Sequence, residues 1–347
     1  MPSKKAPTAD KKEGKKEGKK KSGAKIGQGH VTIPRGVTTI RANAFSRRSD
    51  LTHVTIPKGV TTIGDKAFYR CSALTKVTIR EGVEKIGYGA FSECDALTHV
   101  TIPEGVTEIE GIAFAGCIKL EKVTIPRSVT DIERATFSGC TALTHVTIRG
   151  KVKEIAQAAF ADCKSLEHVV IPGSVTRIGD SAFYRCWSLV DVVMNQGKDE
   201  TMIGWSAFGN CIQLKRIEIP KNVTEIKDSA FFNCQSLEHV VIPRRVTRIH
   251  KWTFAGCTAL ESVEIQEGVT EIEEGAFEKC KSLIEVVIPK SVIRIGRNAF
   301  RRCTSLKSVI LNEGLKEIMT DAFDECESLR NLVIPKGAHR TTGRWGV

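Results

Sequence analysis

The sequence lacks the motifs of the common enzyme classes. It contains no G-x-S-x-G nucleophile turn, no phosphate-binding P-loop, no H-E-x-x-H zinc motif and no glycine fingerprint of a dinucleotide-binding fold. Its histidines and cysteines occupy different positions of an internal repeat, so no histidine is placed to activate a thiol. These absences predict a protein that is not an enzyme and that needs no cofactor.

Segments that would enter or cross a membrane are also absent. No stretch approaches the ~20 apolar residues of a spanning helix. Residues 1–28 contain neither the apolar core of a signal peptide nor an arginine, so they do not resemble a secretory or mitochondrial targeting segment. We therefore expect no membrane insertion and a cytoplasmic or nuclear location.

Residues 1–28 are instead rich in lysine. They hold ten lysines against three acidic residues, which is +7 of the net charge of +12. Because they have almost nothing to bury and their recurring glycines oppose a helix, we predict a disordered Lys-rich tail. Such a tail would be a solubilising leader, a nuclear-localisation signal, or a weak and non-specific contact for a polyanion such as nucleic acid.

The rest of the chain is built from a repeat marked by phenylalanine. Thirteen phenylalanines recur every 23 residues, with a single step of 25 between Phe183 and Phe208. They are Phe45, Phe68, Phe91, Phe114, Phe137, Phe160, Phe183, Phe208, Phe231, Phe254, Phe277, Phe300 and Phe323.

One unit, Leu51 to Ala73, shows the full pattern L-x-x-V-x-I-P-x-x-V-x-x-I-G-x-x-A-F-x-x-C. The alternation V-x-I predicts a short half-buried strand, and Pro57 ends it because proline cannot donate to a sheet. A unit this short cannot bury its own apolar residues, but stacked units can. We therefore predict a repeat solenoid, mainly β, over residues 29–335, with about thirteen 23-residue coils, and a short C-terminal tail at 336–347.

This pattern resembles the BspA-like, or spirochaete-type, leucine-rich repeat, from Val31 to Pro335. The commoner leucine-rich consensus has Asn or Cys shortly after its last strand leucine, where this chain has Gly59, Gly82 or Ser128. The resemblance implies a solenoid that binds other macromolecules, as the family's adhesins do on bacterial and protist surfaces, and it implies no catalytic residues. A surface or secreted adhesin is therefore the alternative to an intracellular protein.

Every cysteine stands three residues after a repeat phenylalanine and three before a leucine. Metal sites favour clustered ligands such as C-x2-C, and the chain has no such pair. Neighbours about 5 Å apart in a parallel stack would be too distant for disulfides, whose Cβ atoms lie about 3.8 Å apart.

We interpret the cysteines as a core ladder of small hydrophobes, with occasional disulfides and a metal or catalytic role as the alternatives. Twelve unpaired thiols are typical of a reducing compartment. The ladder comprises Cys71, Cys94, Cys117, Cys140, Cys163, Cys186, Cys211, Cys234, Cys257, Cys280, Cys303 and Cys326.

The outward positions of the predicted strands form a candidate partner-binding face. Six of the eight histidines share the slot before the inward valine, and the next outward slot changes from threonine in the first coils to mostly Val or Ile in the later ones. The candidate residues are His53, His99, His145, His168, Val241, Val287, Ile310 and Val333. The alternative is that β-branched residues simply suit exposed strands and that duplication copied each slot. His145 and His168 could also share a metal ion.

Two further features lie on the predicted surface. Six residues before the phenylalanine, charge alternates from coil to coil through Glu225, Arg248, Glu271, Arg294 and Glu317, which predicts stabilising pairs. The coil between Phe183 and Phe208 has two residues more than the others, and they fall in 195–203, between Trp187 and Trp205. This loop is either a neutral insertion or a local contact site. If the protein is exported, Asn222-Val223-Thr224 is an expected glycosylation site.

Taken with the absence of catalytic motifs, these features favour a non-enzymatic scaffold that binds a protein partner of unknown identity along its strand face. The alternatives are a cell-surface or secreted adhesin, and non-specific polyanion binding through residues 1–28.

Overall fold

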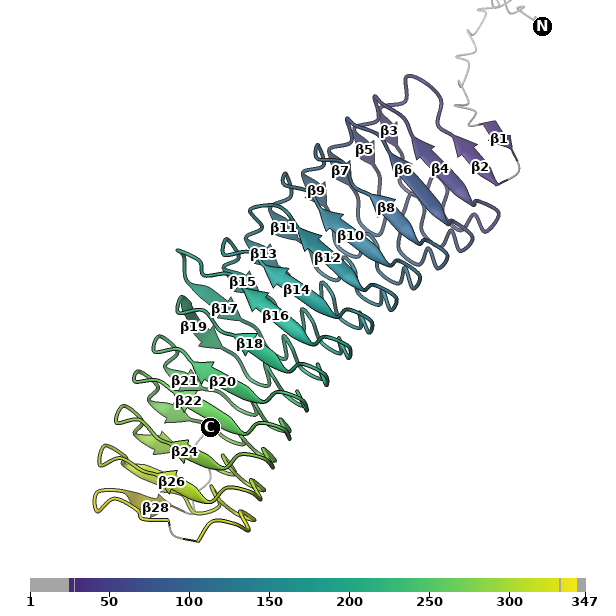
Figure 1. Cartoon of the computed structure of the whole chain (residues 1–347). Helices are drawn as coiled ribbons and strands as arrows, with labels where there is room; N and C mark the ends of the chain where they lie inside the picture. The colour runs from purple at the N-terminus through teal and green to yellow at the C-terminus, as the bar shows by residue number, and fades with distance from the viewer. Residues whose placement is uncertain (1–24, 28, 331, 342–347) are drawn as a thin grey trace, which may run out of the picture.

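The computed structural model describes residues 25–27, 29–330 and 332–341. Short strands stack side by side in chain order and form an elongated rod, from the purple coils at one end to the yellow coils at the other (Figure 1). No helix in the described ranges has the length and apolar character needed to span a membrane.

One strand per coil forms the first side of the rod, and neighbouring strands pair in parallel with equivalent residues opposite each other, such as Val54 and Val77. We call the outward side chains of these strands the strand face. The strands are β2 His30–Thr32, β4 His53–Ile56, β6 Lys76–Ile79, β8 His99–Thr101, β10 Lys122–Ile125, β12 His145–Ile148, β14 His168–Ile171, β16 Asp191–Met194, β18 Arg216–Glu218, β20 His239–Ile242, β22 Ser262–Ile265, β24 Glu285–Val287 and β26 Ser308–Ile310.

A second strand in each coil forms another side, which we call the second side. Its members are β3 Thr39–Ile40, β5 Thr62–Ile63, β7 Lys85–Ile86, β9 Glu108–Ile109, β11 Asp131–Ile132, β13 Glu154–Ile155, β15 Arg177–Ile178, β17 Thr201–Ile203, β19 Val223–Ile226, β21 Arg248–Ile249, β23 Glu271–Ile272, β25 Arg294–Ile295 and β27 Glu317–Met319. The predicted mainly β solenoid of about thirteen coils is confirmed.

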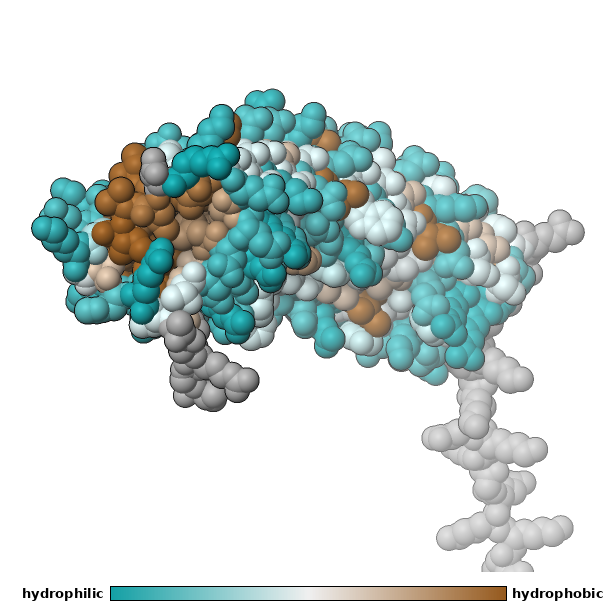
Figure 2. All heavy atoms as spheres, turned by 90° about the horizontal axis from the view of Figure 1, so that it is seen from below, coloured by the Kyte–Doolittle hydropathy of each residue, from teal (hydrophilic) through white to brown (hydrophobic). Residues whose placement is uncertain are grey.

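The core is a set of ladders that run along the rod. The thirteen phenylalanine rings stack with centroids 5.1 to 5.5 Å apart and interplanar angles of 10° or less. The repeat leucines, valines and isoleucines fill the space around them. Hydrophobic side chains also gather at the end made by the C-terminal coils (Figure 2), where Phe323, Leu329 and Leu332 pack against the core but are only half-buried.

A tight turn after each second-side strand holds the phenylalanine. In nearly every coil two residues of this turn have a positive φ: the second residue before the phenylalanine and the second residue after it. In the coil of Phe160 these are Ala158 (φ 55°) and Asp162 (φ 57°). The turn exposes backbone N–H groups to the next coil: Ala158 N donates to Asp180 O at 2.9 Å and Phe160 N to Ala182 O at 2.8 Å. These bonds add a third backbone ladder to the two made by strands.

Replacing Ala158 by glycine should stabilise the protein. A left-handed conformation costs an L-residue about 1–2 kcal/mol, and glycine avoids most of that cost, as Gly89 and Gly275 do at the equivalent turns. We expect the free energy of unfolding of A158G to rise by up to about 1 kcal/mol in urea titrations. Ala159→Gly is the control: it removes a buried methyl group at an ordinary φ and should destabilise. Equal losses in both variants would contradict the argument.

Strand pairing is interrupted at one coil boundary on both sides of the rod. On the first side no pairing joins β18 to β20, and on the second side none joins β19 to β21. Backbone bonds still cross this boundary through the turns, for example from Ser229 N to Lys251 O at 2.8 Å, and through the segments that precede the first-side strands, as from Glu238 N to Lys215 O at 3.3 Å. We call it the seam; the second side alone is interrupted once more, between β9 and β11.

The ends of the solenoid extend beyond the predicted boundaries. β1, Lys25–Gly27, pairs antiparallel with β2, although it falls within the segment predicted to be disordered. Residues 1–24 and residue 28 lie outside the described residues, so disorder and polyanion binding there stay predictions. At the other end β28, His339–Thr341, pairs with β27 inside the predicted C-terminal tail.

From Arg248 onward the alternating charges lie side by side on the second side, as the 23-residue period requires, whereas Glu225, across the seam, pairs with Lys227 of its own coil. Arg248 Nη2 lies 3.7 Å from Glu271 Oε1, and Arg294 Nε donates to Glu317 Oε2 at 2.7 Å. The ladder also extends to earlier coils, where Lys85 pairs with Glu108 at 3.0 Å.

Candidate binding face

The N-terminal half of the strand face carries a row of histidines and lysines. His53, His99, His145 and His168 are all exposed on β4, β8, β12 and β14. The parallel register sets His53 beside Lys76, Lys76 beside His99, and His145 beside His168. In the described part of the chain, no third His, Cys or acidic ligand joins His145 and His168 into a metal-sized group.

The C-terminal half of the strand face is more apolar. Val287 and Ile310 are paired neighbours, 50% and 49% exposed. Val333, which was predicted to continue this row, is 78% exposed but lies beyond β26 in a segment that forms no strand. Val241 is only half-buried, so it contributes less surface. The row is not continuous, because Glu264 lies opposite Val241 and Glu218 lies opposite Val193.

The twelve cysteines lie inside the rod, away from this face. All are free thiols; eleven are buried and Cys326 is half-buried. Each thiol donates to the carbonyl oxygen of the phenylalanine in the preceding coil, as from Cys163 Sγ to Phe137 O at 3.2 Å. That bond explains the choice of cysteine over alanine: the side chain is small and apolar enough for the core, yet it satisfies a turn carbonyl.

Burial keeps the thiols in the middle of the ladder, such as Cys117 and Cys140, neutral. Desolvation raises the pKa of Cys117 to about 12 and also raises the pKa of Cys140 well above its usual range. A reactive or metal-binding cysteine needs a stabilised thiolate, so the middle of the ladder is unsuited to either role.

The insertion folds over a buried amide. Asn222 is 6% exposed; its Nδ2 donates to Asp199 O and to Thr201 Oγ1, each at 2.8 Å, and its Oδ1 accepts from Gln196 Nε2 at 2.9 Å. The expectation that Asn222 is a glycosylation site is therefore wrong for the folded chain, because the amide is enclosed and fully bonded. The motif was in the sequence, but the loop that covers it was not apparent.

Asn222→Ala should destabilise the protein by about 2–3 kcal/mol, because it leaves Thr201 and the backbone of Asp199 without their partner inside a closed loop. Urea or thermal unfolding would measure this. Asn195→Ala, at an exposed position of the same loop, is the control and should have almost no effect. Equal stabilities of N222A and N195A would contradict an anchoring role.

A hollow of about 430 Å³ on the turn side was not expected from the sequence. Tyr184, Phe232 and Trp252 line it together with small polar residues such as Asn210 and Ser229. Trp187 and Trp205, the tryptophans beside the insertion, are exposed but do not line it. The sequence does contain a sign of this hollow in the position directly after the repeat phenylalanine. In three successive coils this position holds Tyr184, Gly209 and Phe232, so a residue without a side chain lies between two large ones.

The geometry defines a leucine-rich-repeat β-solenoid. The BspA type leucine rich repeat region matches residues 25–144, 107–238 and 224–342, in six copies. The chain therefore belongs to the BspA-type leucine-rich repeat family.

Solved structures agree with this assignment. A leucine rich cell surface protein from Faecalibacterium prausnitzii is 31% identical, with 92% of this chain and 86% of that one covered and a TM-score of 0.56. A leucine-rich repeat protein from Bacteroides ovatus is 29% identical over 87% of this chain and 88% of that one, with a TM-score of 0.67. The pneumococcal vaccine antigen PcpA shares the fold at 20% identity, with 88% and 80% covered and a TM-score of 0.51. The comparison with curated proteins gave no match.

Proposed function

We propose that the protein is a non-enzymatic interaction scaffold that binds a protein partner along its strand face. The observation that supports this most directly is the exposed pair Val287 and Ile310, set side by side on a rigid parallel sheet. Exposed aliphatic side chains that adjoin one another favour an interaction site, and solenoids offer extended surfaces of this kind.

The partner's chemistry follows from the two halves of the face. The N-terminal half presents lysines and titratable histidines, whereas the C-terminal half presents aliphatic side chains broken by glutamates. A complementary partner would place an acidic stretch along β4 to β14 and an apolar patch over β24 and β26. Such a partner would be elongated and would span many coils.

Changing Val287 and Ile310 together to threonine tests this proposal. A photo-crosslinking residue placed at position 287 in the native cells would first capture the partner, and the affinity of the purified pair would then be measured. We expect the double variant to bind about tenfold more weakly or worse, a loss of about 1.4 kcal/mol or more.

The control is the double variant Ile118→Thr and Ile293→Thr. These isoleucines are similarly exposed but do not belong to the strands of the strand face. Equal weakening by both double variants, or equal crosslinking from positions 287 and 118, would reject the strand face as the binding surface.

A surface or secreted adhesin is the second candidate function. The likeness to a Faecalibacterium cell surface protein favours it. The free thiols do not oppose it, because buried cysteines with raised pKa values resist oxidation even outside a reducing compartment. Treating intact native cells with a protease distinguishes the two: degradation of the protein supports the adhesin, and protection until lysis supports the intracellular scaffold.

A further inference from the structure

One slot of the repeat holds glycine in some coils and a charged or polar side chain in others. The residue directly after the second-side strand is glycine at Gly64, Gly87, Gly179, Gly204 and Gly296, whereas Arg41, Glu110 and Glu133 occupy the same slot in other coils. A Cβ atom at Gly64 would lie 2.6 Å from Ile40 O, so a side chain in this slot needs the backbone of the preceding coil to lie farther away than it does at Gly64. Around the seam three consecutive coils carry Lys227, His250 and Glu273 in this slot.

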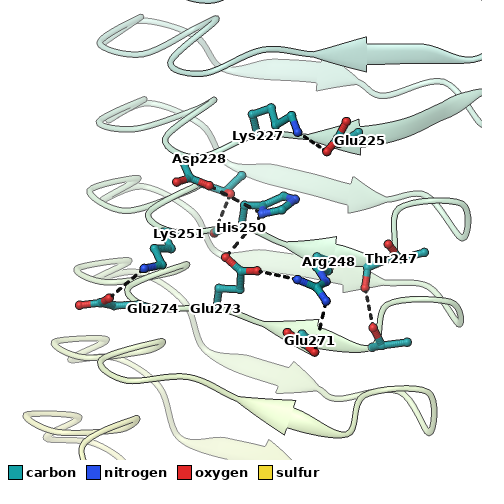
Figure 3. A network of polar contacts seen from close by, with 12 residues as sticks. Glu225, Lys227, Asp228, Thr247, Arg248, His250, Lys251, Glu271, Glu273 and Glu274 are labelled. Atoms are coloured by element: carbon teal, nitrogen blue, oxygen red, sulfur yellow. Dashed lines mark hydrogen bonds and ion pairs between the residues drawn. The ribbon is translucent and has the colours of Figure 1, made fainter. Parts of the chain in front are cut away.

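His250 lies between Glu273 of the following coil and an aspartate of the preceding coil. Asp228, which follows β19, has its Oδ1 3.7 Å from His250 Nδ1, and Glu273 Oε2 lies 3.5 Å from the same nitrogen. The three ligand atoms all lie within 4.8 Å of one another (Figure 3). In the described part of the chain this is the one such group of His, Cys or acidic side chains.

The spacing suits a shared ion better than direct bonds. The distances from His250 Nδ1 to Asp228 Oδ1 and to Glu273 Oε2, 3.7 and 3.5 Å, are both longer than an ordinary hydrogen bond of about 2.7–3.2 Å. Ligand atoms at the corners of a tetrahedron around Zn²⁺, with bonds of about 2.0–2.2 Å, stand about 3.3–3.6 Å apart. The distances of 3.5 and 3.7 Å from His250 Nδ1 lie at or just above the upper end of this range, and Asp228, whose side chain is 42% exposed, has room to adjust.

The surroundings orient the ligands. Arg248 Nη1 lies 3.7 Å from Glu273 Oε1, which leaves Oε2 facing His250 (Figure 3). Lys251 and Lys227 each pair with a glutamate outside the trio, Glu274 and Glu225.

We propose that Asp228, His250 and Glu273 bind a divalent first-row transition metal ion, with Zn²⁺ as the reference ion. An imidazole nitrogen with two carboxylate oxygens suits such ions, whereas Mg²⁺ and Ca²⁺ favour all-oxygen sites. The three side chains are partly buried, His250 being 20% and Glu273 14% exposed, which limits but does not block access by solvent. The fourth ligand position stays open to water.

The position of the site indicates what the ion does. Asp228 stands on one side of the seam, and His250 and Glu273 stand on the other, where neither side of the rod has strand pairing. A bound ion would therefore join the two halves of the solenoid at a boundary where both sides of the rod lack strand pairing. It would act as a structural clamp, because binding to the folded state alone stabilises it.

Titration calorimetry of the full chain, stripped of metal and kept reduced, tests the site with ZnCl₂ and MgCl₂ as probes. We expect one Zn²⁺ ion per chain, no comparable binding of Mg²⁺, and a melting temperature that rises with Zn²⁺ concentration. His250→Gln and Glu273→Gln should each remove both the binding and the rise in melting temperature.

His145→Gln is the matched control, since it removes an exposed histidine that also has a histidine neighbour. It should leave Zn²⁺ binding unchanged. The proposal is overturned if the wild type takes up no Zn²⁺, if H250Q binds it as well as the wild type, or if H145Q is the variant that loses it.

Discussion

Phe183→Ala is expected to lower the free energy of unfolding by about 3–5 kcal/mol. Phe183 is fully buried in the middle of the ring ladder, 5.3 Å from Phe160 and 5.2 Å from Phe208 between ring centroids. Removing the ring deletes two stacking contacts and leaves a cavity between coils that backbone bonds hold in place. The stack cannot collapse to fill the cavity without breaking those bonds.

The loss should also change the form of the transition. In a linear repeat protein each coil is stabilised mainly by its two neighbours, so a central defect weakens both interfaces at once. We expect the thermal transition followed by circular dichroism to broaden or to separate into two steps. A single sharp transition at a lower temperature would mean that the coils unfold as one unit despite the defect.

Phe232→Ala is the matched control. Phe232 is the one phenylalanine outside the ladder and is 41% exposed. Its removal should cost much less than that of Phe183, since most of its surface stays in water in the folded state. Similar losses for the two variants would contradict the central role of the ring stack.

The sequence predicts the fold well because the period places every inward residue. Once Phe160 and Phe183 are known to be one coil apart, their stacking follows, and so does the burial of Cys163 and Cys186. The same reasoning brings Arg248 beside Glu271. Each of these contacts joins equivalent positions of neighbouring coils.

Contacts between unequal positions could not be predicted in this way. Asp228 meets His250 although they are 22 residues apart and occupy adjacent slots, so a comparison of equivalent positions does not pair them. Asn222 was expected on the surface because its sequence motif contains no information about the loop that covers it. The left-handed turn at Ala158 was also missed, because alanine gives no sign of a positive φ.

Raising the pH above about 8.5 is expected to destabilise the protein steeply. Nine ladder thiols have a raised pKa in the folded state, whereas an unfolded cysteine has a pKa of about 8.5. The largest cause is the contact with Cys71 for Cys94, and burial for the other eight. The nine are Cys94, Cys117, Cys140, Cys163, Cys186, Cys211, Cys234, Cys280 and Cys303.

The direction of the effect follows from proton binding. Below pH 8.5 both states hold these protons, so the contribution of the thiols to stability is complete. Between about pH 8.5 and the raised folded pKa values, only the unfolded chain releases protons, and each thiol lowers the free energy of unfolding by about 1.4 kcal/mol per pH unit. With nine such groups, even one pH unit should produce a large loss.

Urea midpoints measured with reductant at pH 7.5, 8.5 and 9.5 would test this, in a range below the titration of most lysines and tyrosines. The control is the triple variant Cys117→Ala, Cys140→Ala and Cys163→Ala, which keeps small apolar side chains but removes three of the nine titrating groups. Its stability should fall with pH about one third less steeply than that of the parent. An unchanged slope would mean that the thiols do not cause the alkaline loss, and that the ladder is less isolated from water than its geometry indicates.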